Sequence, residues 1–293
     1  MTEKKYALTA SKTIREDGKG MDIQYFTRLW SEGKAAEASG KSFWDNRAAE
    51  FNKLVCQGSS DERIKKIVEF LLHNSLLTKN SSVLDIGCGP GRFAVEFAKK
   101  STDVTGLDIS DKMLDYAVKN AEADNLTNVS FKNMNWDEVS LEEHGWRKRY
   151  DLVTAINSPG IHDQITLEKM IDASKGYCFL SNFVDRTDSV QDIIRTEILK
   201  LKGVKFYSNT IYSIFNILWL TGYYPSIAYV DTDREHVRTV EEACVYYGTL
   251  FETDNKSDDE KKYLIRSYLE EISITGFVRE KVRSKTAWIF WKV

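Results

Sequence analysis

The sequence predicts an α/β fold built on a doubly wound, mostly parallel sheet. Short apolar runs alternate with amphipathic stretches of helical length, which is the pattern of successive β-α-β units. The runs have apolar residues at consecutive positions, as strands covered by helices on both faces do. No tandem repeat or low-complexity segment interrupts the pattern between about residues 80 and 185. This segment is therefore the expected core.

Five apolar runs define the expected core strands, and a helix over about 163–174 precedes the fifth. The first run, "SSVLDIG", ends in glycine, and Ser110 after the second run is placed to cap the next helix. The expected strands cover residues 81–87, 103–110, 128–134, 150–157 and 176–184.

The pattern after residue 185 is less regular. Helical spacing recurs around 190–198 and 211–218, and 224–238 alternates like a strand. Thr239 with Glu242 and Ser257 with Glu260 have the spacing of capping boxes, so two more helices are expected. The final stretch, "FVREKVRSKTAWIFWKV", divides at Ser284 into two strand-like halves, which favours an antiparallel hairpin that closes the sheet.

Composition and charge restrict the class of partner. The 293 residues include 41 basic and 44 acidic side chains, for a net charge of −3, so there is no overall attraction to nucleic acid or anionic lipid. The four cysteines and four histidines are scattered without metal-ligand spacing, and no metal site is expected. The apolar stretch 211–230 is interrupted by Asn216, Gly222 and Pro225, which argues against a membrane span. The first twenty residues lack a signal-peptide core, so a cytoplasmic protein is expected.

The most informative motif is "VLDIGCGPGRF" at residues 83–93. A phosphate-binding Walker loop needs Lys and Ser or Thr after its last glycine, whereas Arg92 and Phe93 follow Gly91 here. A dinucleotide fingerprint needs G-x-G-x-x-G, and this loop is one residue short of that spacing. Three glycines in five positions still indicate that a ligand approaches the backbone closely.

The motif resembles the first motif of class I S-adenosylmethionine-dependent methyltransferases, a hydrophobic pair, an acid and then GxGxG. The resemblance implies a Rossmann-like sheet of seven strands and S-adenosylmethionine as the cofactor. Asp108 stands 21 residues after Gly87, where the family keeps the acid that binds both ribose hydroxyls. Asn135 stands where the family usually has an Asp for the adenine amino group, and "SFWDNRAAEF" is similar to the helix that covers the cofactor. The cofactor-binding residues expected from this resemblance are Trp44, Arg47, Asp85, Gly87, Cys88, Gly89, Gly91, Asp108, Ile109, Met113, Asn135, Trp136 and Asn157.

The pattern along the chain, together with the resemblance, predicts a division into four parts. Residues 1–80 are expected to form a helical extension over the cofactor site, and 81–202 the cofactor-binding core. Residues 203–275, which are rich in aromatic side chains, are expected to form a lid that binds the acceptor, with Tyr223 or Tyr224 near its pocket. Residues 276–293 supply the closing strands.

Methyl transfer requires alignment of donor and acceptor, and a general base only where the acceptor must lose a proton. His162, in the loop after the fourth strand, is the candidate base, and the alternative is a histidine at a helix start beside the cap Asp163. The expected acceptor is a small molecule. The alternatives are a methyltransferase acting on protein or RNA, a cofactor-binding protein without transferase activity, and a nicotinamide-dependent oxidoreductase. The stretch Asn157-Ser158-Pro159 matches the motif of nucleic-acid amino methyltransferases poorly.

Overall fold

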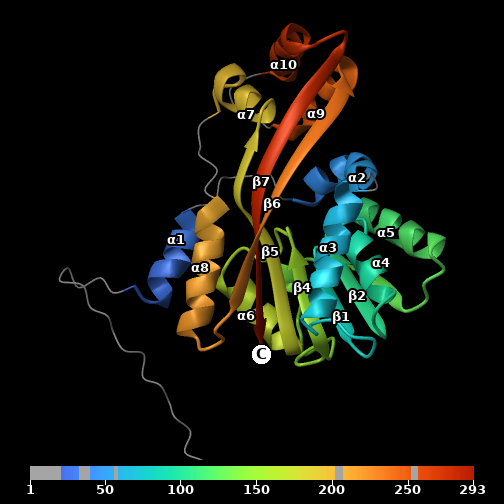
Figure 1. Cartoon of the computed structure of the whole chain (residues 1–293), viewed down its shortest axis with the longest axis vertical. Helices are drawn as coiled ribbons and strands as arrows, with labels where there is room; N and C mark the ends of the chain where they lie inside the picture. The colour runs from blue at the N-terminus through green and yellow to red at the C-terminus, as the bar shows by residue number, and fades with distance from the viewer. Residues whose placement is uncertain (1–20, 33–39, 56–58, 202–206, 252–256) are drawn as a thin grey trace, which may run out of the picture.

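A computed structural model describes residues 21–32, 40–55, 59–201, 207–251 and 257–293. The described residues form a seven-stranded sheet in the order β3-β2-β1-β4-β5-β7-β6 (Figure 1). The first five strands are parallel, whereas β7 is antiparallel to both β5 and β6. The predicted α/β class and the mostly parallel sheet are therefore confirmed. The strands are β1 (Ser82–Ile86), β2 (Asp103–Asp108), β3 (Val129–Asn133), β4 (Tyr150–Ile156), β5 (Ser174–Asp188), β6 (Ser226–Thr239) and β7 (Phe277–Lys292).

Helices cover both faces of this sheet, as the alternating pattern predicts. One face packs against α3 and α4 through residues such as Ile67, Phe97 and Phe179. The other packs against α1, α6 and α8 through residues such as Leu84 and Leu180. The helices are α1 (Ile23–Glu32), α2 (Lys41–Val55), α3 (Ser59–His73), α4 (Arg92–Ala98), α5 (Asp111–Ala123), α6 (Gln164–Ala173), α7 (Gln191–Ile193), α8 (Tyr207–Leu220), α9 (Val240–Leu250) and α10 (Asp258–Ile272), with a 3₁₀ turn η1 (Trp136–Glu138) and a π-helical turn η2 (Ile194–Ile198).

The expectation of a hairpin that turns at Ser284 is wrong, because β7 is one continuous strand. Ser284 pairs with Arg186 of β5 on one side and with Thr232 of β6 on the other. The change in hydropathy at Ser284 reflects a change in how the two faces of β7 are covered. Before Ser284 every second residue of β7 is buried, whereas the run Thr286–Ile289 is buried at every position. The antiparallel closure of the sheet is formed by β6 and β7.

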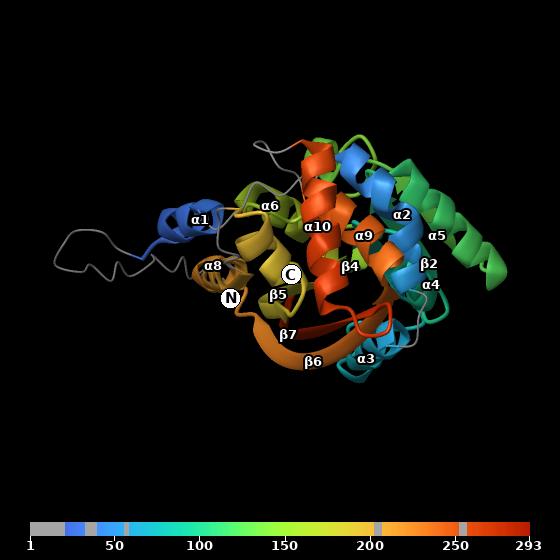
Figure 2. The same ribbon diagram turned by 90° about the horizontal axis from the view of Figure 1, so that it is seen from above.

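A second, smaller lobe stands on the extended ends of β5, β6 and β7. It has its own apolar core, which includes Ile194, Tyr247, Ile265, Leu269 and Val278. The lobe contains α7, η2, α9 and α10, and Figures 1 and 2 place it above the end of the sheet at which β5 leaves the main core. The chain segments of this upper lobe come from both sides of residue 203.

The segment 203–275 consequently differs from the expected lid. Within it, α8 packs on the main core and β6 is the edge strand of the sheet, so only α9 and α10 belong to the upper lobe. Tyr223 and Tyr224 precede the start of β6, which pairs near the end of β7 and lies beside the amino end of β5. They are therefore at the edge of the sheet opposite to the glycine loop, and Tyr224 is 57% exposed.

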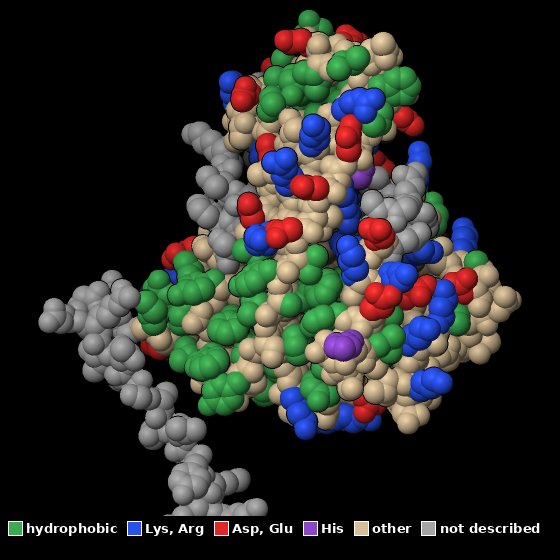
Figure 3. All heavy atoms as spheres, viewed as in Figure 1, with side chains coloured by type: hydrophobic (Ala, Val, Ile, Leu, Met, Phe, Trp, Pro, Cys, Tyr) green, Lys and Arg blue, Asp and Glu red, His purple; other side chains and the backbone are tan. Residues whose placement is uncertain are grey.

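The apolar side chains of α8 are divided between core and surface, with the fully buried ones aliphatic. Ile211, Ile214, Ile217 and Leu218 are buried, as their spacing predicts. A group of large apolar side chains remains exposed on α8 and the adjoining β6, and Figure 3 shows apolar side chains gathered over this part of the molecule. These exposed residues include Tyr212, Trp219, Tyr224 and Tyr229. Among the described residues, no helix is both long and apolar enough to cross a membrane.

Candidate cofactor site

The glycine loop connects β1 to α4 and is attached to the end of β2. The Cys88 N–H donates to the Leu107 carbonyl at 2.8 Å, and the Gly91 N–H donates to the Cys88 carbonyl at 3.0 Å. The Gly89 N–H donates to Oδ2 of Asp108 at 2.9 Å. These bonds hold the loop at the carboxyl ends of β1 and β2, which is where open parallel sheets bind their ligands.

The three glycines of the loop have different neighbours. A Cβ at Gly87 would collide with Ser158, and one at Gly91 would lie 2.7 Å from Cβ of Ala117 and 2.9 Å from Cζ of Phe131. A Cβ at Gly89 would meet only Phe51 of α2, at an ordinary 3.7 Å. Packing within the protein therefore requires Gly87 and Gly91, whereas Gly89 is the glycine with space above it.

Asp108 ends β2 and receives two backbone donors. Its Oδ1 accepts from the Ser110 N–H at 2.9 Å, and its Oδ2 accepts from Gly89. Burial raises the pKa of this carboxyl, while the N–H groups of Ser110 and Gly89 oppose that rise. Each carboxylate oxygen can accept a second hydrogen bond, so the side chain retains capacity for two hydroxyl donors.

Asp85 lies inside the sheet rather than at its open edge. It is 2% exposed and accepts a hydrogen bond from Oγ1 of Thr154 on β4 at 2.7 Å. Burial raises its pKa to about 7, Thr154 lowers it, and Asp108 contributes a further rise. Cys88 is also buried, and burial together with Asp85 and Asp108 raises the pKa of its thiol, so it is not a reactive thiolate.

The helix α2 lies over the glycine loop. Phe51 faces Gly89, and its ring is 6.2 Å from that of Trp44. Ser110 donates to Asp45 at 2.6 Å, and Asn120 donates to both Asn52 and the Pro90 carbonyl, so α2 is tied to α5 and to the loop. Arg47 lies over the rings of Phe43 and, across to the upper lobe, Tyr246.

Four further expected residues lie along the end of β2 and β3. Ile109 is half-buried, and Met113 is buried in the first turn of α5, where its N–H donates to Ser110. Asn135 caps η1 by accepting from the Asp137 N–H at 3.2 Å. Trp136 is buried, and its indole N–H donates to the Thr166 carbonyl at 3.2 Å. Trp136 thus belongs to the main core, and its side chain packs beneath α6.

The loop after β4 brings Asn157, Ser158 and His162 to the same edge of the sheet. Asn157 has a left-handed backbone, with φ at 50°, and its N–H donates to the Ser181 carbonyl. The His162 ring lies 3.2 Å from the Pro159 carbonyl through Nδ1 and 3.5 Å from Oδ1 of Asp137 through Nε2. Asp163 caps α6 in a capping box with Thr166, so His162 does stand directly before a helix cap.

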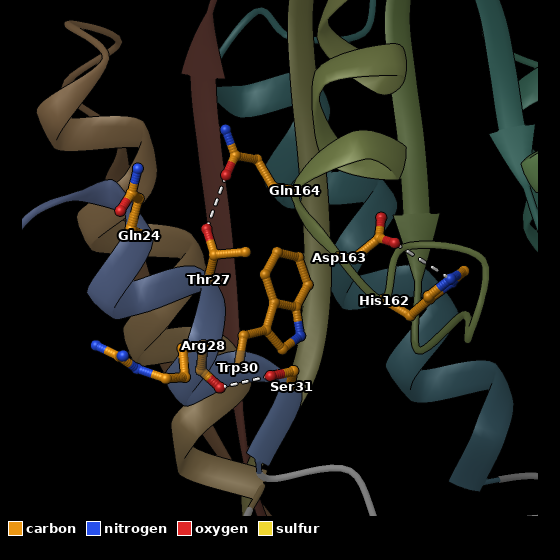
Figure 4. Close-up of a pocket in the computed structure, with 8 residues that line it drawn as sticks. All are labelled: Gln24, Thr27, Arg28, Trp30, Ser31, His162, Asp163 and Gln164. Carbon is orange, nitrogen blue, oxygen red and sulfur yellow. Dashed lines mark hydrogen bonds and ion pairs between the residues drawn. The ribbon is translucent and has the colours of Figure 1, made fainter.

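A cavity of about 300 Å³ lies between α1 and this loop. Thr27 of α1 donates to Gln164 across it at 2.7 Å, and the indole of Trp30 fills part of the space between the two elements (Figure 4). The figure shows the His162 ring pointing away from the α1 side chains. The full lining consists of Gln24, Thr27, Arg28, Trp30, Ser31, His162, Asp163 and Gln164.

The family model for a methyltransferase domain matches residues 77–267, which is more than half of the chain. The chain belongs to this methyltransferase family. It is an enzyme of the S-adenosylmethionine-dependent class, and its mixed seven-stranded sheet is that of the class I fold.

Known proteins similar to this methyltransferase share mainly a short stretch of sequence. A 23S rRNA (uracil(1939)-C(5))-methyltransferase of Aliivibrio fischeri is 37% identical over 83 residues, covering 27% of this chain and 19% of that protein. A ubiquinone biosynthesis O-methyltransferase of Acinetobacter baylyi is 34% identical over 74 residues, covering 25% of this chain and 30% of that protein. The matches thus span less than a third of the length of these relatives.

The structure of this chain resembles, over most of its length, a crystal structure of coclaurine N-methyltransferase bound to N-methylheliamine and S-adenosylhomocysteine. The TM-score is 0.50 at 15% identity, with 93% of this chain and 87% of that chain covered. At this level of identity the likeness concerns the fold.

The residues of the methyltransferase fit S-adenosylmethionine in two respects. Gly89 is the loop glycine whose added Cβ would clash with nothing and would meet only the Phe51 ring of α2, and Asp108 retains acceptor capacity for hydroxyl groups. The bound cofactor would supply an electrophilic methyl group on sulfur. The chain's own contribution is to hold the loop, Asp108 and α2 in one arrangement.

Sequence reasoning missed three residues of this site. Thr154 satisfies Asp85, Ser158 packs on Gly87, and Phe51 covers Gly89. Each lies on another element and meets the motif only through the fold. Phe51 is part of the stretch identified as a cofactor-covering helix, and its position one helical turn from Arg47 is the signal that would have indicated it.

Proposed function

We propose that this methyltransferase transfers the methyl group of S-adenosylmethionine to a small-molecule acceptor in the space between the main core and the upper lobe. The observation that carries the proposal is the upper lobe itself. It has a separate apolar core and stands over the carboxyl edge of the sheet, on the same side as α2 (Figures 1 and 2). A cover of this kind limits the size of an acceptor, because pockets for small molecules are enclosed and bury most of the ligand.

In this proposal the cofactor lies along the glycine loop. Gly89 provides backbone access, Asp108 accepts from the ribose hydroxyls, and Asn135 with the neighbouring backbone of Ile109 and Trp136 borders the adenine. The remaining expected cofactor contacts come from Trp44, Arg47, Asp85, Gly87, Cys88, Gly91, Met113 and Asn157. For Asp85, Cys88 and Met113, which are buried, such contact would be through the loop geometry they maintain.

Alignment is the main catalytic contribution that this arrangement offers. Positioning of donor and acceptor lowers barriers by as much as ~7–11 kcal/mol in model reactions. His162 is proposed as the base for an acceptor that must lose a proton, since it lies in the loop after β4 beside Asp137 and Asp163.

An RNA acceptor is the second candidate, favoured by the 37% identity to an rRNA methyltransferase. That identity extends over only 83 residues, whereas the cover over the sheet edge comes from β5–β7 and the helices between them. Double-stranded or looped RNA requires an open, basic surface for many phosphate contacts.

The test combines calorimetry with an acceptor screen. Purified protein should bind S-adenosylmethionine and S-adenosylhomocysteine with micromolar dissociation constants. Transfer of a labelled methyl group should then occur to a metabolite fraction of low molecular mass and not to total RNA. Labelling of RNA would overturn the small-molecule assignment, and failure to bind either cofactor form would overturn the cofactor site.

His162→Ala provides the test of the base. It should slow turnover and change the pH–rate profile if the acceptor must lose a proton. An unaltered profile would return His162 to the role of a residue at the start of α6. Val118→Ala, an exposed change on α5, is the control.

A further inference from the structure

One face of β6 carries basic side chains where the strand passes from the main core to the upper lobe. Side chains two residues apart on a strand share a face, so Arg234, His236 and Arg238 point the same way. All three are half-buried, whereas the alternate residues Asp233, Glu235 and Val237 are exposed. The register places Arg234 across β7 from Asp188, because both residues pair with Val282.

Carboxylates neutralise only part of this positive charge. Arg238 forms an ion pair with Glu280 at 2.6 Å, and Arg186 with Asp188 at 3.2 Å, with all four side chains largely buried. Burial raises the pKa of Asp188 to about 7, with the adjacent Glu280 adding to that rise, so Asp188 carries less than a full negative charge at neutral pH. Burial lowers the pKa of the His236 imidazole, so the positive charge of this face comes from its arginines, and the Glu50 carboxyl of α2 interacts with Arg238.

Arg234 is the residue of this face without a counter-charge. Within the described parts of the chain its guanidinium forms no ion pair, and its buried Nε–H has no hydrogen-bond partner. A buried N–H without an acceptor costs roughly 1–3 kcal/mol, so a native structure usually supplies one. A water molecule or an anion at this position would satisfy the Nε–H of Arg234.

A second arginine, on α3, is close enough to Arg234 for the two charges to interact. Burial and the charge of Arg234 lower the pKa of Arg63 to about 10, and burial together with Arg186 lowers that of Arg234. Buried guanidinium groups that repel one another are stabilised by an anion placed between them. Arg63 also lies 5.6 Å above the ring of Phe93, the second residue of α4, so the cluster adjoins the end of the glycine loop.

We infer that Arg234 on β6 and Arg63 on α3 bind an oxyanion, a carboxylate or phosphate group carried by the methyl acceptor. The inference rests on the proposed function and names the chemical class of its substrate. The planar guanidinium fork matches either anion with two parallel hydrogen bonds. The burial of the neighbouring Arg186 and Arg238 side chains, 24% and 12% exposed, suits one anionic group rather than a nucleic-acid backbone.

The experiment uses inorganic phosphate and acetate as probes on the full chain saturated with S-adenosylhomocysteine. The product form of the cofactor occupies its own site with its own carboxylate, so any further anion binding is separate from it. The Nε–H resonances of the arginines, followed by ¹H–¹⁵N NMR at constant ionic strength, report binding directly. Arg234 and Arg63 resonances should shift with saturation on adding either probe.

Matched variants assign the site. Arg234→Gln should weaken phosphate binding by about tenfold or more, as expected for a lost charge-assisted bond. Arg234→Lys, which keeps the charge without the fork, should weaken it less. Arg279→Gln, at an exposed position of β7 paired with Glu235, is the control and should leave phosphate affinity unchanged. The affinity for S-adenosylhomocysteine should be equal in all four proteins, which also shows that they fold.

Three outcomes would count against the inference in distinguishable ways. Phosphate that fails to shift Arg234 in the S-adenosylhomocysteine complex would overturn it while leaving the proposed cofactor intact. Loss of S-adenosylhomocysteine affinity in a folded Arg234→Gln protein would assign the arginines to the cofactor's carboxylate. Binding of single-stranded oligonucleotide with tighter affinity than phosphate, and lost in the same variant, would assign them to RNA. Phosphate binding without any S-adenosylhomocysteine binding would refute the proposed function and retain the anion site.

Discussion

Asp108 connects two turns that surround the proposed ribose position. Its oxygens accept from Gly89 in the first βα loop and from Ser110 at the start of α5. The motif and its spacing predict the places of the glycine loop and Asp108 at the ends of β1 and β2, because both belong to one local β-α-β unit. Thr154, Ser158 and Arg234 were not predictable in this way, since their partners are distant in sequence.

Replacing Asp108 should weaken cofactor binding. Each charge-assisted hydrogen bond is worth about 1.5–3 kcal/mol, so Asp108→Ala should raise the dissociation constant of S-adenosylhomocysteine at least tenfold. Asp108→Asn, which keeps one acceptor oxygen, should have a smaller effect. Asp115→Ala, at an exposed position of α5, is the control in the calorimetry. Equal affinities in all proteins would refute the ribose role.

The glycines of the loop should respond differently to one added methyl group. Gly89 and Gly91 both have positive φ, 54° and 72°, so alanine strains the backbone at either position. At Gly91 the methyl group also overlaps Ala117 and Phe131, which typically costs a further ~1–3 kcal/mol. Gly91→Ala should therefore lower the melting temperature more, whereas Gly89→Ala should mainly reduce S-adenosylhomocysteine affinity. The reverse order would contradict the assignment of Gly89 as the open position.

Asp85 should make stability depend on pH. The unfolded chain releases this proton near the ordinary value of about 4, whereas the folded chain retains it to about 7. Between these values the folded state binds more protons, so the free energy of unfolding falls as pH rises, by at most about 1.4 kcal/mol per pH unit. The destabilisation caused by Asp85→Asn should accordingly shrink between about pH 5 and pH 7 in urea titrations. Asp115→Asn is the exposed control, and a pH-independent difference for Asp85→Asn would argue that Asp85 is ionised.

At the scale of elements, local signals located the strands and helices but not their partners. The capping boxes at Thr239 and the cap at Ser257 begin α9 and α10 as expected, because a cap depends on residues three apart. In contrast, the packing of α8 on the main core and the continuity of β7 depend on the elements that lie next to them in the fold. "VRSKT" looks like a turn in isolation, yet neighbouring strands on both sides supply its backbone partners.

A proline at Ser284 distinguishes a continuous strand from a hairpin. Because Ser284 is flanked by β5 and β6, proline would remove a ladder hydrogen bond from the interior of the sheet, and Ser284→Pro should destabilise the protein by about 3 kcal/mol or more. Ser284→Ala, which keeps the backbone N–H, should have little effect. Chemical denaturation measures both, and a tolerated proline would restore the hairpin.

At the scale of the whole molecule, two apolar cores are built on shared strands. The strands β5, β6 and β7 pass from the main core into the upper lobe. Because both cores pack on the same strands, the folding of each lobe stabilises the other. We expect one calorimetric transition, and S-adenosylhomocysteine at a hundred times its dissociation constant should add about 2.7 kcal/mol to the stability. Two transitions, of which one ignores the ligand, would show that the lobes unfold independently.

The shared strands also restrict how the enzyme can open. Tilting the upper lobe would require β5, β6 and β7 to bend together. Because these strands are hydrogen-bonded to one another, they resist such bending. The helix α2 is attached instead through side chains, with Asp45 and Asn52 bonded to α5 and Arg47 and Lys53 in contact with α9, and these contacts can break one at a time. The cofactor and its product would then enter and leave beneath α2. The distance between Arg234 on β6 and the glycine loop would stay constant, and this constant distance would select acceptors by their length.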